Sequence, residues 1–293
     1  MQGTLTGNVQ RHRQPLGFIR HLPRNRNLQV GAILLLAVVA VAILVPVLSP
    51  DGANQINPSA TLAGPSSSHL LGTDDLGRDL LTRLAAGYRI SLEVALGSVA
   101  LACLAGVPLG LWAAVGSSLA DNLIMRTLDV LMAFPALLLA IVVVAVLGAG
   151  TGVLVLAIAI VYAPVVARVM RASALATSKE AFVEAVRARG ASSARILWRH
   201  ILPNSLGPVI VQASILMAIA ILLEAALSFI GLGVQPPTAS LGLMLSDGRD
   251  FMASSPWVVA DPGVAILIVV LGFTLVGDGL QEWLDPKKRA LTR

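Results

Sequence analysis

The sequence predicts an all-α protein that crosses a membrane six times. Of its 293 residues, 56% are hydrophobic and only 13% are charged, and the hydrophobic residues fall in long blocks. A helix needs about 20 apolar residues to cross the hydrocarbon core, so such blocks predict membrane spans. The composition excludes an ordinary soluble domain. The net charge of +5 is typical of basic residues retained beside spans, and we expect no nucleic-acid partner.

The predicted elements follow one another in a simple order. A basic tail at 1–29 precedes the first span at 30–48, and the polar segment at 49–90 contains an amphipathic stretch that we place at the outer interface. A core at 91–282 holds five further spans, and a tail at 283–293 ends the chain. Within the core we expect spans at 91–115, 127–147, 153–167, 207–229 and 262–280.

The distribution of Lys and Arg predicts on which side the loops lie. Six spans place both termini on one side of the membrane, together with the connection at 116–126 and the polar stretch at 168–204. All but four of the 21 Lys and Arg fall on that side, and the four are Arg78, Arg83, Arg89 and Arg249. Because positive residues are retained in the cytoplasm, we expect both termini and residues 168–204 to be cytoplasmic.

Residues 178–204 form the long polar interruption in the later half of the chain. We predict two short helices there. The first ends at Gly190, since glycine adopts the left-handed conformation that closes many helices. Either Ser192 or Ser193 caps the second, and Pro203 marks its end.

Both short helices carry apolar residues at helical spacing. The first is expected to present Phe182, Ala185 and Val186 on one face, and the second carries Ile196, Leu197 and Ile201. The remaining positions are largely basic. A helix pair with an apolar stripe and a basic back, placed between spans, suits the groove of another protein.

No enzymatic constellation is recognisable in the sequence. The four histidines lack metal-ligand spacing, and there is no phosphate-binding loop, nucleophile elbow or CxxC pair. The one cysteine, Cys103, lies within an apolar block. We therefore expect no catalytic activity, no metal and no cofactor. If the protein works with ATP, another chain must bind it.

Four acidic residues fall within or beside the predicted spans: Glu93, Asp129, Glu224 and Asp278. Intramembrane charges often mark substrate pathways. Asp129 follows Arg126 by three residues, which favours a local ion pair. Glu224 is the deepest, and two interpretations stay open for it, a place on a substrate path or a structural hydrogen bond. We retain Glu224 and Asp129 as candidates for a translocation path.

The stretch at 178–204 resembles the EAA loop of ABC importer permeases, which has Glu-Ala-Ala, then a glycine, and later Leu-Pro. The matching residues are Glu184, Ala185, Gly190, Leu202 and Pro203. The chain departs from the pattern at Val186, in place of the second alanine, and at His200, in place of isoleucine. Neither departure removes an essential chemical group.

Two further segments resemble the C-type subunit of the dipeptide, oligopeptide and nickel permease family. The first, LLGTDDLGRDLLTRLAAGYRISL, lies between the first two spans. The second joins GLGVQPPTASLGLMLSDGRD, before the last span, with GDGLQEWLDP at its end. Three separated motifs in the right order make the resemblance specific, and it covers nearly all of the chain from residue 30.

The resemblance implies a type I importer fold and a non-catalytic permease subunit in the inner (plasma) membrane of a bacterium. It implies a heterodimer with a homologous B-type permease, one or two cytoplasmic ATPases, and an external solute-binding protein that delivers di- or oligopeptides. Nickel or another small solute is the alternative cargo. A self-contained secondary transporter is an alternative of another class, but it predicts inverted repeats and leaves the polar stretch unexplained.

The resemblance also assigns roles to residues. Those implied to couple the chain to an ATPase are Phe182, Glu184, Ala185, Arg187, Arg189, Gly190, His200, Leu202 and Pro203. Those implied to face the binding protein are Asp74, Asp75, Arg78, Asp79, Asp247 and Arg249. For this second set, a structural lid built from the same outer segments is an equal alternative.

Overall fold

The computed structural model describes residues 25–49 and 52–284, and this part of the chain is helical, without a β-strand. Most of the predicted tails at 1–29 and 283–293 lies outside the described residues. The elements are α1 (Arg26–Leu48), η1 (Pro58–Ala60), α2 (Leu80–Val115), α3 (Ser118–Met132), α4 (Ala136–Leu147), α5 (Thr151–Ser178), α6 (Ala181–Ala188), α7 (Ser193–Ile196), η2 (Leu197–Ile201), α8 (Leu202–Phe229), α9 (Leu241–Gly248), η3 (Arg249–Phe251) and α10 (Trp257–Leu284).

Within the described residues, five helical segments are long and apolar enough to cross a membrane: α1, α2, α5, α10 and the continuous segment Ser193–Phe229. A sixth span forms if α3 and α4 are counted together, which agrees with the six predicted spans. Several helices extend beyond the predicted ranges. The 36-residue α2 is roughly 54 Å long, so it crosses the hydrocarbon core and continues well past it.

The predicted span at 127–147 is a bent pair of helices. α3 and α4 meet at an angle of 90° across a break that contains Phe134 and Pro135. Proline has no N–H to donate, and its ring disfavours a helical conformation in the residue before it. The predicted span at 127–147 is therefore one span only if this bent pair is counted together.

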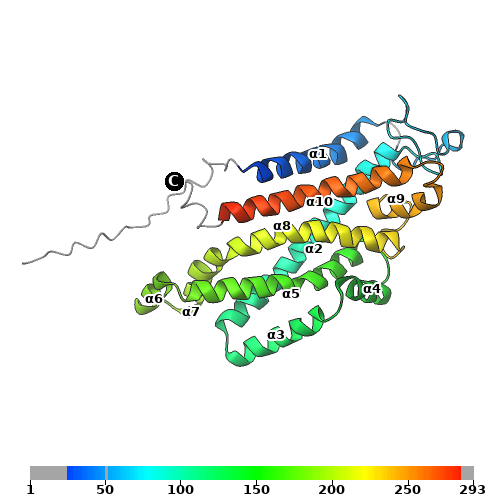
Figure 1. Ribbon diagram of the computed structural model, residues 1–293. Coiled ribbons are helices and arrows are strands. Elements are labelled where there is room, and N and C mark those ends of the chain that lie inside the picture. Colours follow the sequence, from blue (N-terminus) through cyan, green and yellow to red (C-terminus); the bar gives the residue numbers. More distant parts are fainter. Residues whose placement is uncertain (1–24, 50–51, 285–293) are drawn as a thin grey trace, which may run out of the picture.

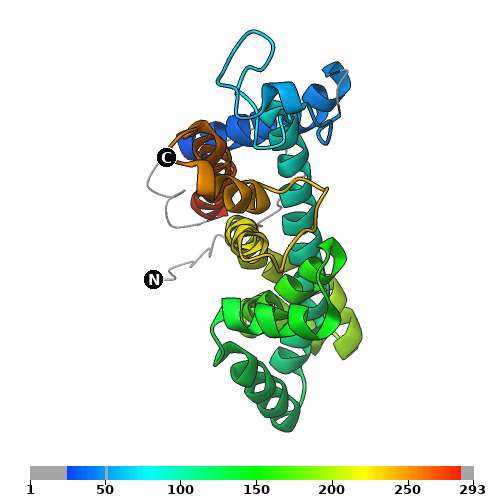
Figure 2. The same cartoon turned by 90° about the vertical axis from the view of Figure 1, so that its right-hand side faces the viewer.

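The long helices lie side by side in one layer (Figure 1). The order across this layer is α1, α10, α8, α5 and α3, and each helix contacts the next. The helix α2 crosses the layer diagonally and contacts α1, α8 and α5 (Figure 2). α6 and α7 lie at one end of the bundle, which we name the loop end, and α9 lies at the opposite end, the α9 end (Figure 1).

Small residues allow α2 to approach α5 closely. A Cβ atom added to Gly106 would lie 2.7 Å from the carbonyl oxygen of Ala163, and one added to Gly110 would lie 2.1 Å from that of Ala167. No side chain fits at these distances. Small residues in membrane helices allow such close packing of backbones.

Candidate functional site

The segment 178–204 joins α5 to α8 at the loop end of the bundle (Figure 1). Val183 is fully buried and Val186 is partly buried, so these two residues hold α6 against the core. Phe182 is 42% exposed, and Ala185 is exposed as well. Of the three residues predicted to share one apolar face, Phe182 and Ala185 are thus exposed and Val186 is partly buried, and the fit of this face to another protein's groove stays a prediction.

The charges of α6 and of Arg189, which follows it, face outward. Glu184, Arg187 and Arg189 are exposed, and none forms an ion pair with another residue in 25–49 or 52–284. Gly190 has a φ of +80°, which confirms the left-handed conformation. Apart from its chain neighbours, no atom of the described residues lies within 4 Å of the place of its missing Cβ, so backbone conformation alone favours glycine here.

The second helix of the segment starts as predicted. The side chain of Ser192 accepts a hydrogen bond from the Arg195 N–H and caps α7. Ile196 and Ile201 are buried, whereas Trp198 is largely exposed. The inner face of this helix is therefore aliphatic, and its outer face combines an aromatic ring with basic residues.

The helix does not end at Pro203. It continues from Ser193 through the π-helical turn η2 into α8, and Pro203 lies in the first turn of α8. A proline inside a helix removes one hydrogen bond and crowds the preceding turn. The wider π-turn directly before Pro203 gives the ring room. The prediction of a stop was wrong, and the Leu202–Pro203 pair instead joins the loop to a membrane span as one helix.

Glu224 is fully buried where α2, α8 and the residues after α8 meet. The Ser91 hydroxyl donates to its Oε2 at 3.0 Å, and the Ser228 hydroxyl donates to its Oε1 at 2.8 Å. The Ser228 oxygen also accepts the Val234 N–H at 3.3 Å. These contacts match the structural alternative for Glu224, because they tie two spans and the following loop together. Its place on a path stays a prediction.

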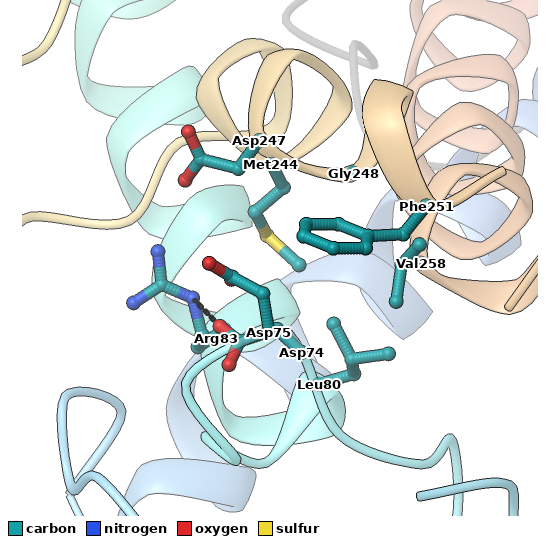
Figure 3. Close-up of a pocket in the computed structure, with 9 residues that line it drawn as sticks. All are labelled: Asp74, Asp75, Leu80, Arg83, Met244, Asp247, Gly248, Phe251 and Val258. Atoms are coloured by element: carbon teal, nitrogen blue, oxygen red, sulfur yellow. Dashed lines mark ion pairs between the residues drawn. The ribbon is translucent and has the colours of Figure 1, made fainter. Parts of the chain in front are cut away.

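A charge cluster lies at the α9 end, where the residues before α2 meet α9 (Figure 3). Asp74 is its centre. The Nε atoms of Arg78 and Arg83 lie 2.6 and 3.4 Å from Asp74 Oδ2, and the N–H groups of Leu76 and Arg78 donate to Oδ1 at 2.9 Å. Arg83 is 1% exposed and also bonds the carbonyl of Ala53. The cluster is thus an internal network rather than a free charged surface.

The other predicted outer residues lie around this network. Asp75, which precedes α2, and Asp247, which lies on α9, line the same small cavity as Arg83 (Figure 3). Partial burial raises the pKa of Asp247, and the Arg83 guanidinium opposes that rise. Asp79 accepts the Thr82 N–H and caps α2. Arg249 is exposed, and among the residues that the structure describes it forms an ion pair only with its neighbour Asp250, outside the cluster.

Comparison with known proteins assigns the chain to a family. Residues 106–290 match the binding-protein-dependent transport system inner membrane component, a stretch that covers more than half of the chain. The chain belongs to this family. It is therefore an inner membrane transport component with several transmembrane helices.

Curated relatives match this inner membrane component over nearly its whole length. The dipeptide transport system permease protein DppC of Alkalihalophilus pseudofirmus is 44% identical over 271 residues, which are 92% of this chain and 89% of that protein. The dipeptide transport system permease protein DppC of Haemophilus influenzae is 40% identical over 91% and 92% of the two chains. The glutathione transport system permease protein GsiD of Pectobacterium atrosepticum is 40% identical over 93% and 91%.

Solved structures show the fold of the family. A chain of the MetNI methionine ABC transporter, in an inward-facing conformation, matches with a TM-score of 0.57 at 19% identity. The match covers 72% of this inner membrane component and 97% of that chain. An amino acid ABC transporter matches with a TM-score of 0.54 over 71% and 94% of the two chains. The type I importer fold is therefore shown.

Two ion pairs of this inner membrane component were not expected from its sequence. Asp129 pairs with Arg168 of α5 at 2.6 Å, so the predicted pairing with Arg126 was wrong. Arg171 donates two hydrogen bonds of 2.6 Å to Asp121. Both pairs form because the polar face of α3 is turned toward α5. The sequence signal for these pairs is that α3 carries the two aspartates and the next span, α5, carries the two arginines.

Proposed function

We propose that this protein is the permease subunit of an ATP-binding-cassette importer of di- and oligopeptides. The observation that carries the proposal is the segment 178–204 at one end of the helical bundle, which exposes Phe182, Trp198 and charges that form no ion pair within 25–49 and 52–284. The sequence has no nucleotide-binding motif, so ATP acts through another chain. The names of the relatives, which include dipeptide and glutathione transport permeases, support a peptide as the cargo.

The proposed assembly has four kinds of component. A homologous B-type permease encloses the path with this chain, one or two cytoplasmic ATPases dock at the loop end, and an external solute-binding protein delivers the peptide at the α9 end. Both termini and the loop end face the cytoplasm, as the positions of Lys and Arg favour. This chain binds neither nucleotide nor metal in the proposal, and catalysis belongs to the ATPases.

The geometry suits the transmission of force from α6 to the spans. The exposed residues Phe182, Glu184 and Arg187 provide the contact with the ATPase. Val183 fixes α6 on the bundle, and the continuous helix Ser193–Phe229 carries a displacement of the loop directly into a span. ATP-driven closure of the ATPases then moves the spans between inward-facing and outward-facing arrangements.

Reconstitution tests the function. The complex with its permease partner, ATPases and binding protein is placed in liposomes, and uptake of labelled dialanine, a tetrapeptide and Ni²⁺ is measured with and without ATP. We expect ATP-dependent and binding-protein-dependent uptake of peptide and no uptake of Ni²⁺. Uptake of Ni²⁺ alone would replace peptide by the alternative cargo, and peptide uptake without the ATPases would favour a secondary transporter.

The orientation is tested with single cysteines. In a Cys103→Ser background, Ser192→Cys marks the loop end and Ser68→Cys marks the α9 end, and both positions are exposed. A membrane-impermeant maleimide added to intact cells is expected to label position 68 and to leave position 192 unlabelled until the membrane is opened. The reverse pattern would overturn the proposed orientation.

A further inference from the structure

A polar groove lies between α3 and α5, apart from the loop and the outer cluster described above. Its volume is about 250 Å³. It is lined by Asp121, Asn122, Met125, Asp129, Arg168 and Arg171. Ligand sites commonly measure about 300–1,000 Å³, so this groove is large enough only for a small ligand or for one end of a longer one.

The groove contains two carboxylates and two guanidinium groups, each paired with its opposite. Arg171 binds Asp121 through two nitrogens at 2.6 Å, and this pair is about one-quarter exposed. Arg168 binds Asp129 at 2.6 Å, and the side chains of this second pair are 50% and 59% exposed. The second pair is therefore open to whatever fills the groove.

The exposed apolar residues of α3 lie on a different side of the helix from the groove. Leu119, Leu123 and Val130 lie within about 40° of one another around the helix, and all three are largely exposed. Asp121 lies on the opposite side of the helix, Asp129 lies roughly 100° around it from these residues, and both pair with arginines of α5. Because charges facing hydrocarbon are costly, the apolar face suits lipid or a partner helix, and the charged face suits water.

The position along α5 places the groove near the loop end. α5 has 28 residues and is roughly 42 Å long, which exceeds the ~30 Å hydrocarbon core. Arg168 and Arg171 lie in its second half, within the last three turns before Ser178. α3 begins directly after α2 ends at the same end of the bundle (Figure 1). With the loop end in the cytoplasm, as proposed above, the groove lies near the cytoplasmic end of α5.

We infer that the groove is an electrostatic contact site for peptides in the inner part of the translocation path, with Arg168 receiving a carboxylate and Asp129 receiving an ammonium group. The inference rests on the proposed function. A peptide carries a carboxylate at one end and an ammonium group at the other. On binding, it replaces the Arg168–Asp129 ion pair by two ion pairs, one between Arg168 and its carboxylate and one between Asp129 and its ammonium group. The net gain is small, because the protein's own ion pair is lost and both ends of the peptide give up water, and weak binding suits a path that must release its cargo.

A purely structural role for the same residues makes a different prediction. If the two ion pairs only hold α3 against α5, loss of either partner weakens the transporter for every peptide alike. If they contact the peptide, loss of the arginine leaves a net negative groove, and loss of the carboxylate leaves a net positive one. The two variants then change charge preference in opposite directions.

The test uses the complete reconstituted complex with its own binding protein and two labelled peptides, Ala-Lys and Ala-Glu. The measured quantity is the ratio of Ala-Lys to Ala-Glu uptake, divided by the wild-type ratio, so the preference of the binding protein cancels. We expect Arg168→Gln to raise this ratio about fivefold and Asp129→Asn to lower it about fivefold, the effect of one uncompensated charge near water.

Four control variants accompany the test. Arg126→Gln removes a positive charge from α3 outside the groove, and Asp278→Asn removes a negative charge from α10, so both are expected to keep the wild-type ratio. Arg168→Lys retains the charge and is expected to keep it too. The double variant Arg168→Gln/Asp129→Asn removes both charges and is expected to restore the ratio while total uptake falls.

The outcomes separate the inference from the function on which it rests. A ratio that stays within twofold of wild type in both single variants, with peptide uptake retained, overturns the groove as a contact site and leaves the importer proposal standing. The groove is also overturned as a contact site if Arg168→Gln and Asp129→Asn both abolish peptide uptake, and neither Arg168→Lys nor the double variant retains any uptake. A wild-type complex that takes up neither peptide overturns the proposed function and this inference together.

Discussion

The two charged regions at opposite ends of the bundle differ in how their charges are used. At the α9 end, Arg78 and Arg83 are buried and both reach Asp74. At the loop end, Glu184 and Arg187 are exposed and form no ion pair within the described part of the chain. The charges at the α9 end bind one another and hold that region together, whereas the charges at the loop end are free to bind another protein.

The difference in burial and pairing distinguishes charges that stabilise the fold from charges that can bind a partner. Removal of one partner from a buried ion pair leaves an uncompensated charge, so such residues govern stability. Exposed unpaired charges add little to stability and act through partners. The α9 end therefore resembles the structural lid more than an open docking surface, although Asp75, Asp247 and Arg249 keep exposed edges.

The largest effect is expected for Arg83→Ala in the outer cluster. The variant leaves Asp74 with one of its two arginines and removes the bond to the Ala53 carbonyl, so we expect a loss of about 3–5 kcal/mol. Thermal unfolding of the protein in nanodiscs measures it. The matched control is Arg249→Ala, whose exposed pair contributes less than about 1 kcal/mol. Equal losses in the two variants would remove the distinction between the regions.

Two glycines with nearly equal φ sharpen the comparison. Gly77 at the α9 end has φ +71°, and its added Cβ would lie 1.9 Å from the Asn57 carbonyl oxygen. Gly190 has φ +80° and open space around it. Gly190→Ala is expected to cost about 1–2 kcal/mol from conformation alone, and Gly77→Ala about 1–3 kcal/mol more because of the overlap. Denaturation of both variants and of the wild type measures the two losses of unfolding free energy, and equal losses would contradict the comparison.

The exposed charges of α6 are expected to affect assembly rather than stability. Glu184→Gln with Arg187→Gln should change the unfolding free energy by less than about 0.5 kcal/mol, as exposed positions usually do. Retention of the ATPases during purification should fall roughly tenfold, since charge pairs across an interface contribute to its affinity. Arg89→Gln, an exposed charge on α2, is the control. Unchanged retention in the double variant would count against α6 as the contact.

The smallest effect is a pH dependence at the α9 end. Because burial raises the pKa of Asp247 above its ordinary value of about 4, the protonated form is favoured in the folded state. Its contribution to stability is complete below the ordinary pKa and is lost as the pH rises through the raised pKa. Asp247→Asn should remove this part of the pH profile and stabilise the protein slightly at pH 7. A profile identical to wild type would contradict the assignment.

Local sequence rules predicted the features that depend on neighbouring residues. Gly190 adopts the left-handed conformation and Ser192 caps the next helix, because both depend on the backbone next to them. The rule that a proline ends a helix failed at Pro203, because a π-turn precedes it and the helix continues as α8.

The sequence by itself determined the membrane class and the family, because hydrophobic length and motif spacing are properties of the chain alone. It also determined the number of spans, which is six when the bent pair α3 and α4 is counted as one span. Only the tertiary structure decided which charges meet. Asp129 pairs with Arg168 of α5 and not with Arg126, its neighbour in sequence, since the packing of α3 turns one polar face toward α5. Ion pairs between helices depend on rotation about the helix axis, and packing partners set that rotation.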